Sequence, residues 1–136
     1  MIGEMEKLCM EQEGFVSKVY KDSLGYDTIG FGFLLSNGVP REVAEYWFNF
    51  IVQKNRTFLL GLQWFADLDA VRQSVIENMA YNMGFDHLFE FRHMIEAIQD
   101  KNWTQASTEM LSSVWANQVG NRAVVLAKIM ETGLMP

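Results

Sequence analysis

The chain has 136 residues, with 11 lysines and arginines against 17 aspartates and glutamates, which gives a formal net charge of −6 at pH 7. This length is typical of one domain and is long enough to bury a core without disulfide or metal cross-links. The acidic balance argues against nucleic-acid binding and against docking on an anionic membrane, because both use clusters of lysine and arginine. No apolar stretch approaches the roughly 20 residues that span a bilayer. We therefore expect no nucleic-acid partner and no membrane insertion.

A small antiparallel sheet is predicted near the N-terminus. A helix is expected over residues 3–12, and five glycines then fall between residues 14 and 38 among valines, tyrosines and phenylalanines. Turn residues between short runs of β-formers are typical of antiparallel strands. We place the strands near 16–21, 26–30 and 32–35.

The rest of the chain has the apolar periodicity of helices. A helix is expected to begin at Pro40, because proline is favoured at a first helical position. In other segments apolar residues recur at intervals of three and four, as on one face of a helix. Helices are expected at 58–66, 68–83, 87–99, 103–112, 114–118 and 121–131. Because the sheet and the helices are segregated along the chain, the fold class is α+β, mostly α.

Metal-binding and nucleophile motifs are missing from the sequence. His87 and His93 are six residues apart, and no CxxC or HExxH pattern exists. We interpret both histidines as surface residues and the single cysteine, Cys9, as a core position of the first helix. The four tryptophans are core candidates, and only Trp115, which lies among polar residues, is a candidate cleft residue.

Glu13 and Asp22 are the candidate pair for acid and base chemistry. Glu13 stands at the expected end of the first helix, where the negative end of the helix dipole favours a protonated carboxyl and so suits a general acid. Asp22 follows in the first turn of the sheet, and Thr28 on the next strand could hydrogen-bond a water. Carboxyls roughly 6.5–9.5 Å apart would suit an inverting glycosidase. The spacing alone leaves open that Glu13 is a solvated helix end and Asp22 an ordinary turn residue.

A longer pattern surrounds these residues. Glu13-Gly14 is followed by Val19-Tyr20-Lys21-Asp22-Ser23-Leu24-Gly25-Tyr26-Asp27-Thr28-Ile29-Gly30-Phe31-Gly32. This order resembles the lysozymes of T-even bacteriophages, glycoside hydrolase family 24, whose shared pattern is E-G, a short spacer and Y-x-D-x-x-G-x-x-T-I-G-x-G. The resemblance continues through Leu34-Leu35, Asn37-Gly38-Val39, Leu68 to Arg72, Met83-Gly84, Trp103 and Trp115 to Ala123, and so covers nearly the whole chain.

The resemblance implies a lysozyme-like architecture, with a small N-terminal sheet, a helical C-terminal lobe and a cleft between them. We expect a single domain, residues 1–136. Its parts would be a first helix over 1–13, a small sheet-containing lobe over 14–56 and a helical lobe over 57–136.

The resemblance also implies residue roles. Glu13 would protonate the glycosidic oxygen, Asp22 would be the base or electrostatic partner on the opposite face of the sugar, and Thr28 would position the attacking water. The bond would be the β-1,4 link between N-acetylmuramic acid and N-acetylglucosamine in peptidoglycan, and no metal or organic cofactor is implied. Family positions that contact saccharide match Leu34, Tyr81, Met94 and Glu109, and a supporting arginine near the catalytic glutamate matches Arg122.

Several residues depart from the family pattern. Phe33 stands where histidine is common, so we expect apolar packing in place of an ion pair. Met94 replaces a small hydroxyl residue, Glu109 replaces an amide and Tyr81 replaces another aromatic residue. The segment between the sheet and residue 68 is shorter than in the best-known members, which predicts a trimmed small lobe and a more open cleft.

We expect a phage endolysin that acts as a monomer on the glycan strands of peptidoglycan during host lysis. Without a signal peptide, it would stay in the host cytoplasm until a holin-type route released it to the periplasm. Two alternatives remain open: a virion-associated lysozyme domain that opens the wall at infection, and a catalytically weak glycan-binding module, which the departures at Met94 and Glu109 motivate. An anhydro-sugar product would instead indicate transglycosylase chemistry.

The net charge is unusual for such a function, because many enzymes that lyse the cell wall are basic and the wall is anionic. Residues 1–60 hold six lysines and arginines against eight acidic residues, and residues 61–136 hold five against nine. Neither part is basic, so we expect little long-range attraction to the wall.

Overall fold

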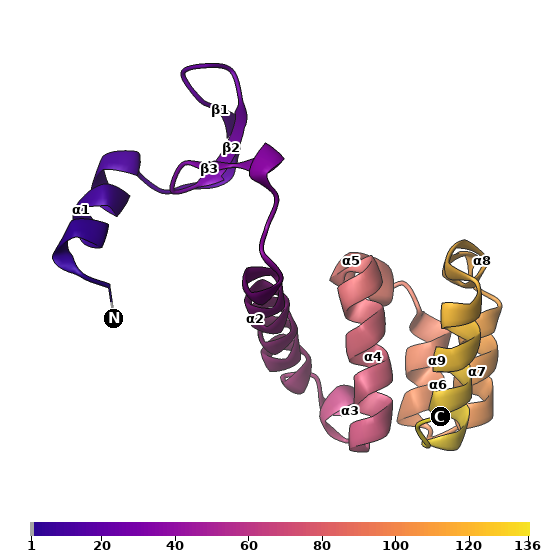
Figure 1. Ribbon diagram of the computed structural model, residues 1–136. Coiled ribbons are helices and arrows are strands. Elements are labelled where there is room, and N and C mark those ends of the chain that lie inside the picture. Colours follow the sequence, from indigo (N-terminus) through magenta and orange to yellow (C-terminus); the bar gives the residue numbers. More distant parts are fainter. Residues whose placement is uncertain (1) are drawn as a thin grey trace. The chain divides into compact units, whose positions relative to one another are not determined.

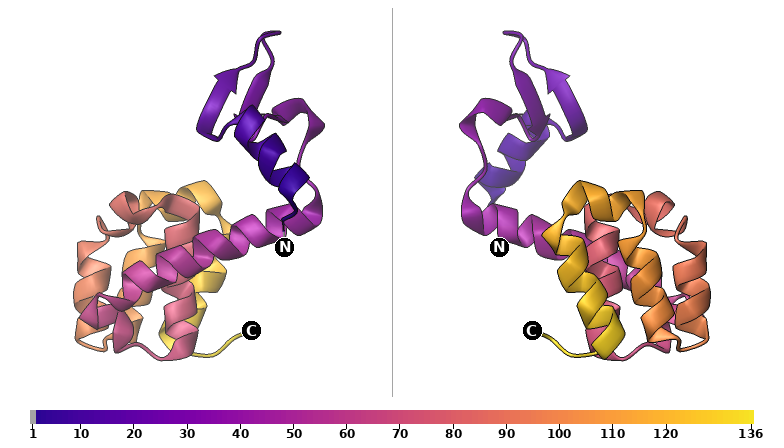
Figure 2. Two further views of the ribbon diagram at one scale, coloured as in Figure 1. Left: turned by 90° about the vertical axis from the view of Figure 1, so that its left-hand side faces the viewer. Right: turned by 90° about the vertical axis from the view of Figure 1, so that its right-hand side faces the viewer.

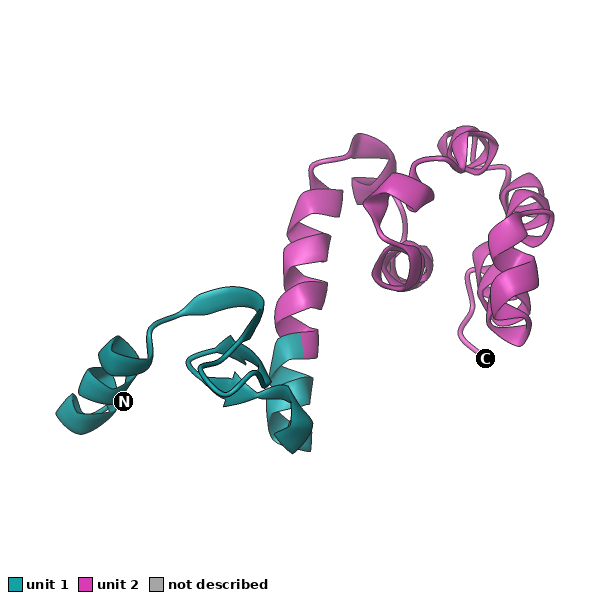
Figure 3. Cartoon of the chain, turned by 90° about the horizontal axis from the view of Figure 1, so that it is seen from above, with its two compact units in different colours: residues 1–47 teal, residues 48–136 magenta. Residues whose placement is uncertain are grey.

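The computed structural model describes residues 2–136 and divides the chain into two compact units, residues 1–47 and 48–136, which are described separately (Figure 3). The fold is α+β and mostly helical, as expected. In chain order the elements are α1 (Glu4–Glu13), β1 (Val16–Lys21), β2 (Asp27–Gly30), β3 (Phe33–Leu34), the 3-10 helix η1 (Leu35–Asn37), α2 (Arg41–Leu60), α3 (Gln63–Ala66), α4 (Ala70–Met83), α5 (Phe85–Leu88), α6 (Arg92–Gln99), α7 (Trp103–Leu111), α8 (Val114–Val119) and α9 (Asn121–Thr132) (Figure 1).

The first unit contains the three-stranded antiparallel sheet, in the order β1-β2-β3. Thr28, in the central strand β2, lies opposite Tyr20 on one side and opposite Leu34 on the other. The three expected strands are therefore confirmed, although β3 is only two residues long. Before the sheet, α1 ends at Gly14, whose φ of 73° is easily adopted only by glycine, and the chain turns there into β1.

Side-chain caps define where several helices of the second unit begin. The side chain of Asp69 accepts a hydrogen bond from the backbone N–H of Arg72 at the start of α4. Asn102 and Ser113 make the same kind of bond at the starts of α7 and α8. Each cap satisfies a backbone donor that has no partner within the helix.

The hydrophobic core lies in the second unit. Helix α7 packs against α6 and α9, and α9 also packs against α4 (Figure 2). The largest fully buried apolar side chains are Leu59, Phe65, Val75, Ile76, Met79, Leu88, Met94, Met110 and Met130. Among the helices described, none has the length and hydropathy of a membrane span.

Arg72 ties the beginning of α4 to the end of α9. Its side chain is 11% exposed and donates hydrogen bonds to the backbone oxygens of Met130 (2.6 Å) and Glu131 (3.0 Å). Its guanidinium also pairs with Asp69 at 3.1 Å and lies 4.0 Å from the ring centroid of Trp103. A positive charge at the C-terminal end of a helix opposes the negative end of the helix dipole, so this contact stabilises α9.

Some expectations about the helices are wrong in detail. The expected helix over 87–99 is two helices, α5 and α6, because Phe91 has a ψ of 56° and interrupts the helical backbone between them. The stretch 58–66 is likewise divided between the end of α2 and α3. Cys9 is exposed, since α1 buries none of its residues, and Trp47 is 56% exposed. Neither residue is a core position.

Candidate active site

The carboxyl group of Glu13 lies against the turn that joins β2 to β3. A Cβ atom built on Gly32 would be 2.5 Å from Oε2 of Glu13 and 3.2 Å from its Cδ, so the carboxyl occupies the space that a side chain would need. Gly32 also has a φ of +74°, which L residues with side chains rarely adopt. The second glycine of the T-I-G-x-G sequence is therefore what lets the end of α1 approach the sheet.

The first glycine of the same sequence accommodates Phe33. A Cβ atom on Gly30 would be 2.7 Å from the ring of Phe33, and the rings of Phe31 and Phe33 meet edge to face with centroids 6.3 Å apart. Apolar packing at Phe33 agrees with what the sequence predicts, although the residue remains 60% exposed.

Asp22 lies directly after β1 and is held by its own turn. Its Oδ1 accepts hydrogen bonds from the backbone N–H groups of Leu24 (2.9 Å) and Tyr26 (2.8 Å). These bonds fix the orientation of the carboxylate. Within residues 2–136 its Oδ2 accepts no hydrogen bond, so this oxygen can accept a hydrogen bond or a proton from a ligand.

Thr28 is 2% exposed, and its hydroxyl donates a hydrogen bond to the backbone oxygen of Tyr26 at 2.9 Å. Since the hydroxyl proton is engaged, Thr28 can bind a water through its oxygen lone pairs and only as an acceptor. The same Tyr26 oxygen accepts the backbone N–H of Asp22 at 2.9 Å. The backbone of Tyr26 thus links Asp22 and Thr28. The sequence gives no sign of this link, because Tyr26 takes part in it through its backbone alone.

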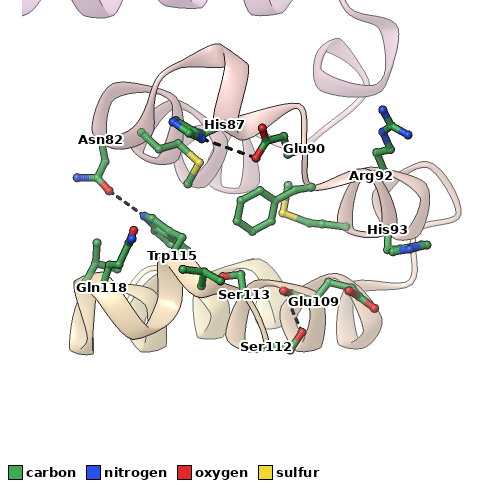
Figure 4. A pocket seen from close by; sticks show the side chains of 15 residues that line it. Asn82, His87, Glu90, Arg92, His93, Glu109, Ser112, Ser113, Trp115 and Gln118 are labelled. Carbon is green, nitrogen blue, oxygen red and sulfur yellow. Dashed lines mark hydrogen bonds and ion pairs between the residues drawn. The ribbon is translucent and has the colours of Figure 1, made fainter.

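The candidate saccharide-contacting residues are distributed over several elements. Leu34 belongs to β3, opposite Thr28. Met94 and Glu109, from α6 and α7, line one pocket of about 760 Å³ in the second unit, so the structure brings this pair together (Figure 4). Tyr81 does not line this pocket, and its ring packs edge to face on Phe48 with centroids 4.9 Å apart.

The pocket combines an apolar floor with a charged rim. Trp115, the candidate cleft residue, lines it and donates its indole N–H to Asn82 Oδ1 at 2.8 Å (Figure 4). Met94 is fully buried, whereas Glu109 accepts a hydrogen bond from Gln105 at 2.8 Å. Exposed charged or titratable residues at the rim are His87, Glu90, Arg92 and His93. The sequence indicates His87 and His93 only as surface residues and singles out neither Glu90 nor Arg92, because nothing in it shows that a pocket lies beside them.

Arg122, on α9, donates from Nε (3.1 Å) and Nη2 (2.7 Å) to Oδ1 of Asn78. This amide orients the guanidinium without neutralising it, and across residues 2–136 no carboxylate forms an ion pair with Arg122. Its positive charge is therefore available to a ligand. The described residues include no cluster of histidine, cysteine, aspartate and glutamate that could hold a metal ion.

Comparison with known proteins identifies a family over nearly the whole chain, the same one that the sequence motif resembles. A family model described as phage lysozyme matches residues 10–130, which include every candidate residue above. The chain is 25% identical to "Probable T4-type lysozyme 1" of Dictyostelium discoideum over 166 aligned positions, covering 99% of this chain and 98% of the relative. The alignment has more positions than this chain has residues, so the relative contains residues that this chain lacks.

Two phage proteins are also similar. The "Pre-baseplate central spike protein Gp5" of Enterobacteria phage T4 is 28% identical over 160 positions, covering 95% of this chain and 28% of the relative. The "Peptidoglycan hydrolase gp36" of Pseudomonas phage phiKMV is 28% identical over 128 positions, covering 87% of this chain and 14% of the relative. With the family model matched from the end of α1 to the end of α9, the chain belongs to the phage lysozyme family and is a glycosidase of the lysozyme type.

Proposed function

We propose that this lysozyme cleaves the β-1,4 bond between N-acetylmuramic acid and N-acetylglucosamine in peptidoglycan, with inversion at the anomeric carbon. The observation that carries the proposal is the position of the Glu13 carboxyl, which depends on the bare backbone of Gly32. Asp22 and Thr28 belong to the same unit and share hydrogen bonds to the backbone of Tyr26.

Each side chain has a definite part in the proposed reaction. Glu13 donates its proton to the glycosidic oxygen as the bond from that oxygen to the anomeric carbon breaks. A water attacks the same carbon from the opposite face and transfers a proton to Oδ2 of Asp22, as in inverting glycosidases. The water donates its other hydrogen to Thr28, whose hydroxyl can only accept because its own proton is bound to Tyr26.

The pocket of the second unit supports a role in substrate binding. Its mixture of aromatic, aliphatic and charged groups suits a polar ligand with apolar faces, such as the substituted sugars of peptidoglycan. Met94 offers no hydrogen bond where the family usually has a hydroxyl, and the carboxylate of Glu109 can only accept. We propose that Glu109 and Arg92 select among the charged groups that the glycan strand carries.

We propose a biological role in host lysis, with the enzyme held in the host cytoplasm until it is released to the periplasm, where it acts as a monomer. The match to a T4-type lysozyme, which covers 98% of that relative, supports this proposal. A role in virions, opening the wall at infection, is the second candidate. It is favoured by the match to the pre-baseplate central spike protein of phage T4, of which the similar segment covers 28%.

The catalytic proposal is tested with Glu13→Gln. This change keeps the shape of the side chain and removes the transferable proton, so the rate should fall by about 10²–10⁴-fold. The measurement is the loss of turbidity of Gram-negative cells whose outer membrane has been permeabilised.

The matched control is Glu11→Gln, an exposed glutamate two residues earlier in α1, which should leave the rate unchanged. Equal clearing by Glu13→Gln and wild type would contradict the role of Glu13. Proton NMR of the first-formed product tests the stereochemistry, since inversion of a β-link gives the α anomer and a β product would contradict it.

A further inference from the structure

A second pocket in the helical unit shares no residue with the one described above. It has a volume of about 390 Å³ and lies between α3, the start of α4 and the connection from α6 to α7. Asp69, which caps the start of α4, lines this pocket, whereas Met83, at the other end of α4, lines the larger one. The two linings come closest on α6, where Met94 lines the larger pocket and Ile98 lines this one.

We propose that this second pocket is an anchoring site that binds an N-acetylhexosamine unit of the glycan strand. We call it the tryptophan pocket, after Trp64 and Trp103, which line it together with Gln63, Gln99 and Lys101. The proposal rests on the proposed function, because the glycan strand is the polymer that this enzyme would meet.

The chemistry of the lining matches an uncharged sugar. The indole ring of Trp64 presents a large apolar face, against which the C–H face of a pyranose can pack. Trp103, one face of which is covered by the Arg72 guanidinium, adds to the apolar lining. Amide groups of Gln63 and Gln99 and the ammonium group of Lys101 supply hydrogen bonds for hydroxyl and acetamido groups. The volume lies within the range of small-molecule sites.

The lining is less suited to a cation. Oδ1 of Asp67 already accepts a hydrogen bond from Gln63 at 2.7 Å, and Asp69 is paired with Arg72 at 3.1 Å. The Arg72 guanidinium also lies over Trp103, so a cation–π contact is already made there. A cationic ligand would compete with these contacts and with Lys101, whereas a neutral ligand would leave them in place.

The backbone at Lys101 is a second, independent observation. Its φ is 55°, and it is the one non-glycine residue with positive φ among the residues that the structure describes. It directly follows the C-cap of α6, and the next residue, Asn102, donates its N–H back to the oxygen of Ala97 at 2.8 Å. Glycine is strongly favoured at such a position. Here a lysine is placed at the edge of the pocket in spite of the backbone strain.

The experiment measures how much protein sediments with purified, insoluble peptidoglycan. Trp64→Ala and Lys101→Gly are compared in a Glu13→Gln background, which prevents digestion during the assay. Loss of a stacking or hydrogen-bonding partner should weaken binding about three- to tenfold. Lys128→Ala, which removes an exposed lysine of α9 outside the pocket, is the control and should bind as the parent does.

Lys101→Gly separates binding from folding, because glycine relieves the strained φ. Its melting temperature should stay the same or rise while binding falls. With Glu13 intact, both pocket variants should clear insoluble peptidoglycan more slowly but hydrolyse short soluble glycan fragments as the wild type does. A tetramer of N-acetylglucosamine should compete with sedimentation.

Three results would overturn the anchoring site. These are unchanged sedimentation of both variants, a parallel loss on insoluble and soluble substrates, and competition by free lysine but not by the N-acetylglucosamine tetramer. Failure of the proposed hydrolytic function would give a different set of results. In that case the wild type would hydrolyse neither substrate, while sedimentation would still report on the pocket by itself.

Discussion

Gly32 carries two constraints that act on different properties of the protein. Its positive φ is a property of the backbone and affects stability, whereas the missing side chain leaves room for the Glu13 carboxyl and affects chemistry. The atom that an added Cβ would meet is the end of a flexible side chain, which can move away. Substitution should therefore displace the Glu13 carboxyl, the proposed proton donor, more readily than it unfolds the protein.

Gly32→Ala should lower the free energy of unfolding by about 1–2 kcal/mol, the cost of a side chain in the left-handed region. It should lower the hydrolytic rate by at least about tenfold, because Glu13 leaves its position. Urea unfolding and turbidity clearing measure the two effects separately.

Gly38→Ala is the matched control for this substitution. Gly38 has a similar φ of +72°, but an added Cβ would meet nothing within 4 Å. This variant should also lose stability, because a side chain is strained at this positive φ, but it should keep its activity. If both variants lost activity equally, strain rather than the displacement of Glu13 would be the cause.

At the scale of elements, the start of α4 depends on the charge of Asp69. Partial burial raises the pKa of this carboxyl, but hydrogen bonds from the backbone and side chain of Arg72, together with its positive charge, outweigh burial and hold the pKa below its usual value near 3.8. A carboxyl whose pKa is lowered by folding stabilises the folded state at pH values above its unfolded pKa. That contribution is lost as the pH falls through the folded pKa.

Asp69→Asn should therefore cost stability at neutral pH but not in acid. Asparagine still caps a helix, so the loss should reflect the charge and be about 0.5–1 kcal/mol at pH 7. The stabilities of wild type and variant should begin to converge near pH 4 and meet once the pH has fallen below the lowered folded pKa. Urea unfolding at several pH values measures this. Asp100→Asn is the control, because among the described residues the Asp100 carboxylate forms no ion pair. The difference in stability between wild type and this variant should not change with pH in the same way.

The sequence predicts elements better than it predicts where helices break. The strands and the glycine-rich turns are local, so β1 to β3 could be placed from residue types alone. The break between α5 and α6 could not, because Phe91 is an ordinary apolar residue and its type gives no sign of its non-helical ψ of 56°.

For the candidate site, the motif points to Glu13, Asp22 and Thr28. The resemblance gives Met94 and Glu109 as saccharide-contacting positions, but only the structure shows that they line one pocket. The charged rim at His87 and Arg92 depends on which helix surfaces enclose a pocket. Such an arrangement has no signal in a single sequence.

At the scale of the whole molecule, acidic side chains exceed basic ones throughout the chain, and the net charge is −6. A basic lysozyme is drawn to the anionic wall by long-range attraction, which salt screens. This enzyme should gain little from such attraction and must rely on contacts made at short range.

Its activity should therefore fall less with added salt than that of a basic lysozyme. The comparison is the rate of turbidity clearing from about 0.01 M to about 0.15 M ionic strength, over which the screening length falls from about 30 Å to about 8 Å. We expect the rate to change less than about twofold, whereas the rate of a basic lysozyme should fall steeply. A steep fall here too would show that a local positive region, such as that around Arg122, attracts the wall.

The exposed sulfur atom of Cys9 gives this enzyme a site for selective covalent labelling. It is the single thiol of the chain, and it precedes Glu13 by four residues, so both side chains project from the same side of α1. A maleimide fluorophore attached there would sit about one helical turn, roughly 5 Å, from the proposed proton donor. Every preparation thus carries a unique labelling position from which the arrival of glycan at Glu13 can be followed as a change in emission.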